Sequence, residues 1–276
     1  MGYLGYLPAI ERPRTFNEKL LWLKLYHRDP AMRRFADKLT ARDAACAAVP
    51  AIRLPELLGV YERVDDVPFA DLPDHTVLKS NHGSGHVRLL SRPYDEAEVR
   101  ASAERWLTRP YGAETNEWHY AEVPPRLIVE RFVGDPATPP VDYKVFVFSG
   151  EAVLVQLFSG RFRRLERRMV DTAWREIPVY RGAYPGGPPI VPDPAELPPK
   201  PACLDTMLDQ AERLGAPFPF VRADFYVVDD EPVFGELTFF PNGGHVEFRP
   251  RTFDVELGAR LELPDPEPSS SSSTPR

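Results

Sequence analysis

The chain has 276 residues, a formal net charge of −7 at pH 7 and 43% hydrophobic residues. The negative charge argues against general nucleic-acid binding, and the lack of 18 consecutive apolar residues argues against a membrane-spanning helix. The two cysteines, Cys46 and Cys203, have no metal-ligand spacing and predict neither a zinc site nor a disulfide framework. We find no signal-peptide pattern, so we expect a cytoplasmic protein with two lobes or one large domain.

Helices are predicted first along the chain, followed by strands. A capping box over residues 15–18 predicts a helix to about His27, because its Thr and Glu side chains satisfy free amides of the first turn. The Asp29-Pro30 pair predicts the start of a second helix, since proline is favoured in a first helical turn. A third helix is expected from about Lys38 to Ala48, and residues 51–90 are expected to be rich in strands.

The rest of the chain alternates predicted helices with groups of strands. Residues 94–108 predict a helix, and residues 126–159 predict three strands. A long connection over 160–201 is rich first in arginine and then in proline and glycine, so stiff loops are expected there. A further helix is predicted over 203–214, and a hairpin over 219–237 follows it.

Charged residues lie among core-type residues in this last hairpin. Arg222, Asp224 and Glu236 alternate with apolar side chains, and an acidic turn over 229–231 joins the two strands. Burial of such charges is unfavourable unless they are paired or hold a metal ion. Two carboxylates on neighbouring strands suit Mg²⁺, while a buried Arg–Asp ion pair with an edge glutamate is an equally weighted interpretation of these residues alone.

A glycine-rich turn within residues 77–90 is a second candidate for ligand binding. Lys79 ends the strand before it, and Gly83 and Gly85 allow the backbone to close over a ligand. Successive amides in such a turn can bind an anion, and a lysine beside them supplies positive charge for phosphate. The turn matches neither a Walker A loop nor a dinucleotide-binding fingerprint, so taken alone it favours an ordinary hairpin turn.

Taken together, these segments resemble the TupA-like ATP-grasp proteins over most of the chain, from about residue 14 to about residue 258. The Asp37-Lys38 pair resembles the start of the ATP-grasp region, and Lys79 resembles the second lysine, just before the phosphate-covering loop. Residues 126–133 resemble the strand that becomes the adenine hinge. Residues 142–150 resemble the next strand, whose basic residue reaches the γ-phosphate.

The expected metal ligands lie in the last motifs of the resemblance. Arg222 and Asp224 fall on the family's Arg-x-Asp, and residues 236–242 align with the superfamily's Glu-x-Asn-x-x-Pro-Gly. Thr238 stands where asparagine is usual, and Asn242 stands where glycine is usual. This departure leaves open whether one or two metal ions are held.

The resemblance implies a role for each matching residue. Nucleotide contacts are expected from Lys38, Lys79, Ser80, His82, Gly83, Ser84, Gly85, Glu130, Arg131, Val133, Asp135 and Lys144. The expected metal ligands are Asp224, Glu236 and Thr238, and the expected catalytic residues are Arg222, Lys144 and Lys79. Substrate contacts are expected from Arg161, His82, Asn242 and His245.

The fold implied by the resemblance is the α+β ATP-grasp fold, in which two α/β lobes sandwich ATP. The usual N-terminal Rossmann-like domain is expected to be reduced to a short helical segment. We expect an N-terminal arm and helices over 1–36 and a first lobe with the phosphate loop over 37–130. A second lobe with the metal site is expected over 131–262, and a disordered tail over 263–276.

An arginine-rich segment follows the three central strands. Residues 161–168 contain five arginines. A solvated basic face and an anion-binding platform beside the site are both compatible with this composition. Under the second interpretation the segment holds a carboxylate or phosphate of a substrate, and Arg161 is the first residue to test.

The activity implied by the resemblance is that of an ATP-dependent carboxylate–amine ligase working through an acyl phosphate. ATP and Mg²⁺, or Mn²⁺ in its place, are the expected cofactors. A small-molecule or polymeric carboxylate and an amine acceptor are the expected partners, with a homodimer as a further option. The alternatives are an ATP-grasp kinase acting on an alcohol and a catalytically silent module that binds nucleotide or carbohydrate.

Overall fold

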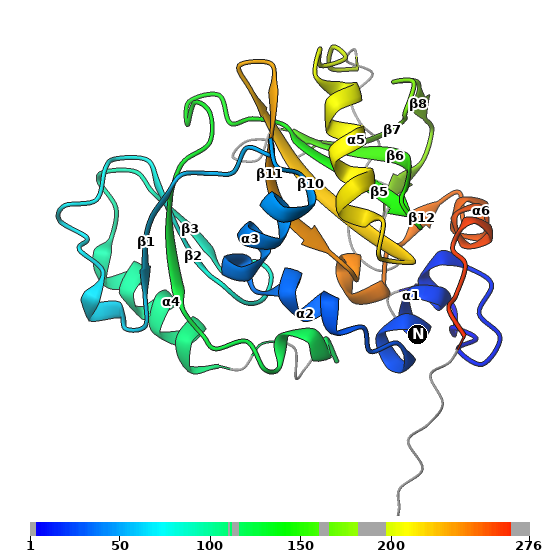
Figure 1. Cartoon of the computed structure of the whole chain (residues 1–276), viewed down its shortest axis with the longest axis horizontal. Helices are drawn as coiled ribbons and strands as arrows, with labels where there is room; N and C mark the ends of the chain where they lie inside the picture. The colour runs from blue at the N-terminus through cyan, green and yellow to red at the C-terminus, as the bar shows by residue number, and fades with distance from the viewer. Residues whose placement is uncertain (1–3, 110, 112–115, 160–165, 182–196, 266–276) are drawn as a thin grey trace, which may run out of the picture.

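The computed structural model describes residues 4–109, 111, 116–159, 166–181 and 197–265. These residues form two main antiparallel sheets with helices packed against them, and the sheets lie side by side (Figure 1). The expected α+β class is confirmed. None of the described helices is long and apolar enough to cross a membrane.

The first sheet has four strands in the order β1-β4-β2-β3. Its elements are β1 (Leu57–Tyr61), β2 (Thr76–Ser80), β3 (Val87–Leu90) and β4 (Leu127–Arg131), with the helix α4 (Glu96–Thr108) and the 3₁₀ turn η1 (Val64–Asp66) beside them. Leu78, Trp106 and Leu127 are buried in the core that the sheet shares with α4. Because β2 is paired on both edges, the strand that carries Lys79 is held rigidly.

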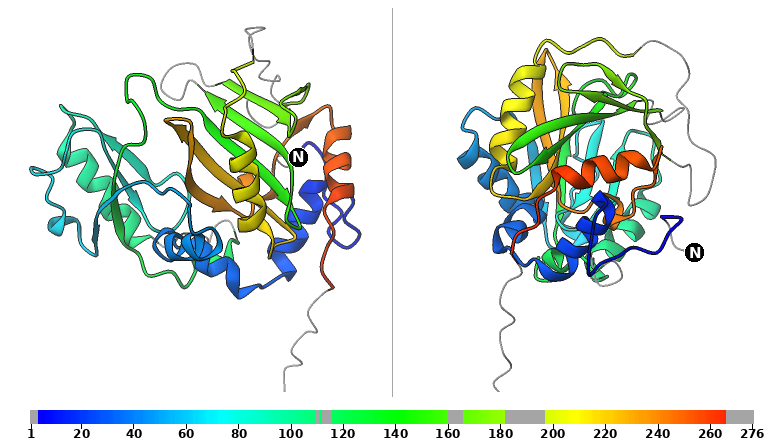
Figure 2. Two further views of the ribbon diagram at one scale, coloured as in Figure 1. Left: turned by 45° about the horizontal axis from the view of Figure 1, so that its top comes forward. Right: turned by 90° about the vertical axis from the view of Figure 1, so that its right-hand side faces the viewer.

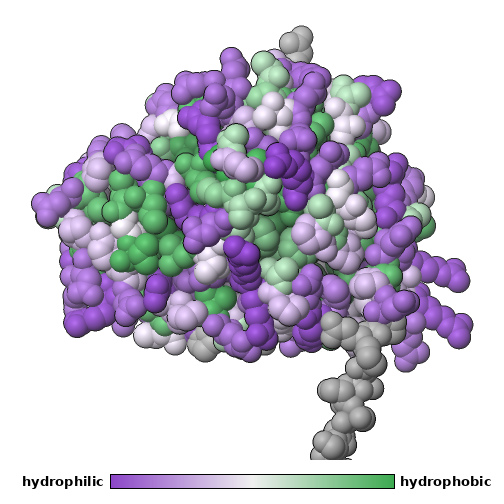
Figure 3. Space-filling view, in the orientation of Figure 1, coloured by the Kyte–Doolittle hydropathy of each residue, from purple (hydrophilic) through white to green (hydrophobic). Residues whose placement is uncertain are grey.

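The outer edge of this sheet is less covered than its centre. Leu57 and Val60 of the edge strand β1 are 38% and 37% exposed. Figure 3 shows hydrophobic side chains at the surface of this lobe, interleaved with polar ones. Such scattered exposure is ordinary for an edge strand and needs no partner to explain it.

The second sheet has six strands in the order β11-β10-β5-β6-β7-β8. Its elements are β5 (Asp142–Phe148), β6 (Glu151–Ser159), β7 (Glu166–Asp171), β8 (Glu176–Ile177), β10 (Phe220–Val228) and β11 (Glu231–Thr238), with the helix α5 (Leu204–Gly215) across one face. A Cβ at Gly215 would lie 2.5 Å from Val147, so the helix and the sheet approach closely there. Since side chains alternate along a strand, Lys144 and Asp224, which line a cavity together with residues of the first sheet, face away from α5. The arrangement of α5 on the other face of the second sheet can be followed in Figure 2.

Helices near both ends of the described chain complete the core of the second sheet. They are α1 (Phe16–Tyr26), α2 (Pro30–Ala36), α3 (Lys38–Ala48) and α6 (Thr252–Arg260). The capping box is confirmed, because Thr15 and Glu18 exchange hydrogen bonds at the start of α1. Phe16 is fully buried, with its ring centroid 4.8 Å from that of Phe220 in β10. The N-terminal helices therefore belong to the core of the second sheet.

Two predictions about local structure were wrong, and one helix was not predicted. The connection over 160–201 contains β7 and β8 and also β9 (Tyr180–Arg181), which pairs with β12 (Phe248–Arg249). Helix α6 was not predicted, and β2 ends at Ser80, one residue beyond Lys79. The arginine-rich composition hid the alternation of β7, whose third to fifth residues are buried. Arg161 and residues 266–276 of the expected tail lie outside the described residues.

Candidate functional site

A cavity of about 500 Å³ lies between the two sheets. Its walls come from β2, β3 and β4 on one side and from β5, β10 and β11 on the other, with Lys38 at the start of α3. The volume is within the range that is typical of small-molecule sites. The cavity therefore joins the glycine-rich turn and the charged hairpin in one site.

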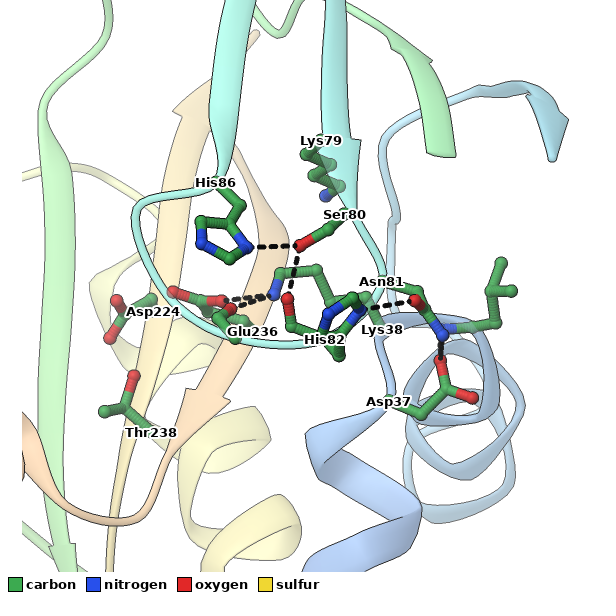
Figure 4. A network of polar contacts seen from close by, with 12 residues as sticks. Asp37, Lys38, Lys79, Ser80, Asn81, His82, His86, Asp224, Glu236 and Thr238 are labelled. Carbon is green, nitrogen blue, oxygen red and sulfur yellow. Dashed lines mark hydrogen bonds and ion pairs between the residues drawn. The ribbon is translucent and has the colours of Figure 1, made fainter. Parts of the chain in front are cut away.

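The glycine-rich turn between β2 and β3 forms part of the cavity wall (Figure 4). Gly83 and Gly85 have φ angles of +81° and +76°, which glycine adopts without strain. A Cβ at Gly83 would also lie 2.5 Å from the ring of Tyr111. The Nζ of Lys38 donates a hydrogen bond to the Gly83 carbonyl over 2.7 Å, so the turn is attached to α3.

The base of the turn is held by a buried polar network (Figure 4). The Ser80 hydroxyl donates to the carbonyl of His82 and lies 3.2 Å from Nδ1 of His86. The Asn81 amide donates to a carboxylate oxygen of Asp37 over 3.0 Å. Ser80 and His82 thus support the turn from beneath and do not line the cavity.

A glutamate aligns the lysine of β2. The Nζ of Lys79 lies 2.6 Å from Oε2 of Glu130, and Nη1 of Arg42 lies 3.2 Å from its Oε1. Glu130 is 5% exposed, so a charge at this depth needs such partners. Both of its oxygens are paired with cations, and Glu130 fixes the position of the Lys79 ammonium at the cavity wall.

The charged hairpin places a buried ion cluster opposite this wall. Asp224 accepts hydrogen bonds from Nε and Nη2 of Arg222 over 2.6 and 2.7 Å, and it also accepts one from Lys144. Nη2 of Arg222 donates to the Thr238 hydroxyl over 3.0 Å. Burial would raise the pKa of Asp224, but Arg222 and Lys144 outweigh it and hold the pKa below its ordinary value. Asp224 is therefore ionised at neutral pH.

Glu236 is the more open carboxylate of the hairpin. It pairs directly across the strands with Asp224, and a β-bulge follows at Gly235. Its side chain is 37% exposed, and its Oε2 lies 3.7 Å from Nζ of Lys38. Burial lowers the pKa of Lys38, and Glu236 partly opposes that effect.

Twelve of the predicted site residues line the cavity: Lys38, Lys79, Gly83, Ser84, Gly85, Glu130, Arg131, Val133, Lys144, Arg222, Asp224 and Glu236. Six described ones do not: Ser80, His82, Asp135, Thr238, Asn242 and His245. The carboxylate of Asp135 accepts hydrogen bonds from the Ala137 amide and the Thr138 hydroxyl, so it stabilises a local turn. Thr238 lies behind the cavity wall against Arg222.

Several lining residues were missed by the reasoning from sequence. They are mostly apolar or aromatic and include Val77, Val87, Leu89, Phe132, Asp142 and Tyr226. The period of two along a strand identifies some of them, because Val77 lies two residues before Lys79 and shares its face. Phe132 and Pro140 belong to the segment after β4, where no periodic pattern applies.

Asp224 and Glu236 fit a hard divalent cation by their chemistry. Carboxylate oxygens are the ligands that Mg²⁺ prefers, and the protein normally supplies only one or two of them. Both side chains line the same cavity from paired strands. The described residues contain no group of three or more His, Cys, Asp and Glu side chains that could hold a metal ion.

Two buried histidines should make the fold sensitive to acid. Burial, together with nearby positive charges, lowers the pKa of His82 to about 4 and that of His119 to about 3. The unfolded chain binds these protons from pH 6.5 downward, so the free energy of unfolding should fall as the pH falls. The expected slope is about 1.4 kcal/mol per pH unit for each histidine. Carboxylates with a lowered pKa, such as Asp224, lose their contribution below about pH 5.

Urea unfolding at pH 6.5 and pH 5 measures this slope. His119→Phe should reduce it, since His119 already packs against the rings of Phe239 and Phe240. His75→Gln is the matched control, because the side chain of His75 is 46% exposed. An unchanged slope in His119→Phe would contradict the prediction.

Several solved structures are similar to this chain at low sequence identity. Among solved structures, the D-alanine–D-alanine ligase from Bacillus anthracis complexed with ATP is 15% identical, with a TM-score of 0.39 over 75% of this chain and 54% of that chain. The L-amino acid ligase from Bacillus licheniformis is 13% identical, with a TM-score of 0.46 over 76% and 44%. The ATP-grasp ligase PsnB complexed with a minimal precursor is 15% identical, with a TM-score of 0.41 over 76% and 54%.

The chain thus spans about half of the length of these solved proteins. The comparison with curated proteins found no match. Residues 18–262 match the family described as TupA-like ATPgrasp. That match covers most of the sequence and includes both walls of the cavity, so the chain belongs to the TupA-like ATP-grasp family.

Proposed function

We propose that the protein is an ATP-dependent carboxylate–amine ligase that forms an amide bond through an acyl phosphate. The observation that carries this proposal is the convergence of opposite charges on one cavity. Lys38, Lys79 and Lys144 come from three separate elements, and Asp224 and Glu236 face them from one hairpin. Such a site suits a reaction that depends on charge stabilisation and positioning.

The three lysines are assigned to the phosphates of ATP. Lys38 and the glycine-rich turn are joined by the hydrogen bond to Gly83, so a bound phosphate would contact both. Lys79 is oriented by Glu130, and Lys144 lies against Asp224 on the opposite wall. The apolar wall formed by Val77, Leu89 and Phe132 is suited to the adenine ring.

Asp224 and Glu236 would hold Mg²⁺, or Mn²⁺ in its place. The bound ion would draw negative charge from the phosphoryl group that is transferred. The Thr238 hydroxyl accepts a hydrogen bond from the guanidinium of Arg222. Thr238 would therefore act by holding Arg222 in position.

In the proposed reaction, an oxygen of the substrate carboxylate attacks the γ-phosphorus and ADP leaves. The amine nitrogen then attacks the carbonyl carbon, loses a proton, and inorganic phosphate leaves. Arg222 would stabilise the oxyanion that forms in the second step. The turn over 83–85 would cover the acyl phosphate and keep water away from it. Acidic sugars or glutamyl chains of a cell-envelope polymer, and the carboxylates of peptides or natural products, are equally compatible with these residues.

A hydroxylamine trap tests this function. The protein would be mixed with Mg-ATP, hydroxylamine and pools of amino acids and uronic acids, and hydroxamate and ADP would both be measured. Hydroxamate in an amount equal to ADP is the expected result, because hydroxylamine intercepts the acyl phosphate. ADP with a stable phosphorylated alcohol would replace the ligase by a kinase. The absence of ADP with every pool would argue for a silent binding module.

A further inference from the structure

An arginine on β7 has no polar partner among the described residues. Arg167 and Arg168 follow one another and therefore point to opposite faces of the second sheet. Arg168 is 7% exposed and pairs with Glu176 over 2.9 Å. Arg167 is half-buried, and its Nε is fully covered without a hydrogen-bond partner.

Arg167 lies on the face of the sheet that carries the cavity. It is directly opposite Phe158 in β6, and Phe158 is directly opposite Asp142 in β5, which lines the cavity. The guanidinium carbon of Arg167 is 5.1 Å from the centre of the Phe158 ring, and Nζ of Lys144 is also 5.1 Å from it. Arg167 and Lys144 thus share one aromatic ring, and Lys144 contacts Asp224.

Within the part of the chain that the structure describes, no carboxylate pairs with Arg167 in the way that Asp224 pairs with its neighbouring cations. Lys144 and Arg222 both bind Asp224, whereas Arg167 contacts the ring of Phe158. Burial lowers the pKa of Arg167, which reflects the unfavourable removal of its charge from water. A guanidinium presents a planar fork of N–H donors, and this fork matches the geometry of a carboxylate.

We propose that Arg167, supported by Phe158, binds a second carboxylate of the substrate, apart from the one that is activated. This inference rests on the proposed ligase function. The activated carboxylate must lie near Asp224 and Glu236, whereas Arg167 lies on β7, two strands away from β5, the strand that carries Lys144. The substrate class is therefore a dicarboxylate, such as an acidic residue with a second free carboxylate or a chain of acidic units.

Binding measurements with paired probes test the subsite. The pairs are N-acetylglutamate with N-acetylglutamine, and digalacturonate with its monomethyl ester, so each pair differs by one carboxylate. Calorimetric titration would use the full chain with Mg²⁺ and a non-hydrolysable ATP analogue. The wild type should bind at least one dianionic probe more tightly than its partner by about 10- to 100-fold, as expected for a charged hydrogen bond.

Arg167→Gln should abolish this preference, and Arg167→Lys should keep part of it, because a lysine retains the charge but not the fork. Arg175→Gln is the matched control, since the side chain of Arg175 is 80% exposed and pairs with Asp171 on the same strand-to-strand turn. Thermal unfolding of each variant separates loss of the subsite from loss of the fold. The proposal is overturned if the wild type shows no preference in either pair or if folded Arg167→Gln retains it.

The two tests separate failure of the subsite proposal from failure of the ligase proposal. Hydroxamate formation without a preference for dianionic probes would retain the ligase and remove the subsite. A preference that depends on Arg167, without hydroxamate formation, would retain the subsite and remove the proposed reaction.

Discussion

Glu236→Gln is expected to reduce ATP turnover on the order of a thousand-fold, by analogy with the loss of a key electrostatic group from an active site. The substitution keeps the size of the side chain and removes the charge that a divalent cation needs. Because the Glu236 side chain is 37% exposed, the fold should be little affected. ADP release under saturating Mg-ATP measures the effect.

Asp224→Asn should lower turnover to a similar extent and should also weaken the fold. The neutral side chain leaves Arg222 and Lys144 without their buried counter-charge. Breaking a buried ion pair in this way destabilises a protein by roughly 3–5 kcal/mol. Urea unfolding of the variant at pH 7 measures the loss of stability, and ADP release measures the loss of turnover.

The same hairpin provides matched controls for both substitutions. Glu231→Gln and Asp230→Asn change the same chemical groups at the exposed turn, away from the cavity. Both control variants should turn over ATP at the rate of the wild type. The assignment of Asp224 and Glu236 fails if their variants retain normal turnover.

Gly258→Ala is expected to destabilise the fold by at least about 3 kcal/mol, the upper part of the range for an overpacked core. A Cβ at this position would lie 2.2 Å from the Arg14 carbonyl oxygen and 2.8 Å from the Phe16 amide nitrogen. These atoms belong to the backbone that begins α1 and cannot rotate away. Helix α6 is also anchored there, since Asp254 accepts a hydrogen bond from the Asn17 amide over 3.0 Å.

Helix propensity alone predicts that Gly258→Ala stabilises the protein. Alanine is favoured over glycine within a helix by about 1 kcal/mol. Ala259→Gly, at the exposed neighbouring position, should therefore destabilise the protein by about that amount. Equilibrium unfolding in urea compares the two variants. A Gly258→Ala protein as stable as the wild type would show that α1 and α6 do not pack as described.

Features that depend on a few neighbouring residues were predictable from the sequence. The capping box at Thr15 and the first turn at Pro30 set helix starts through contacts within one turn. The hairpin around residues 229–231 was predicted because the turn and the alternation on both sides agree. The need for glycine at position 83 was also predicted from the sequence. The structure gives two reasons for it, the positive φ angle and the close approach of the Tyr111 ring.

Features that depend on distant segments were not predictable in the same way. Helix α6 carries few local signals and is held by its contact with α1. Strand β7 was obscured by its arginines, and only the register with β6 shows that Arg167 faces the cavity side while Arg168 is buried on the other. The pairing of Glu130 with both Lys79 and Arg42 joins segments that are far apart in the sequence.

The motifs that resemble the family, the helix starts and the charged hairpin follow from the sequence, because they depend on local hydrogen bonds and on alternation along one strand. The tertiary structure alone decided which charges meet. Asp224 became both an ion-pair partner of Arg222 and a wall of the cavity, so the two interpretations of the hairpin are compatible. That outcome depends on strand order, register and burial, which no short stretch of sequence specifies.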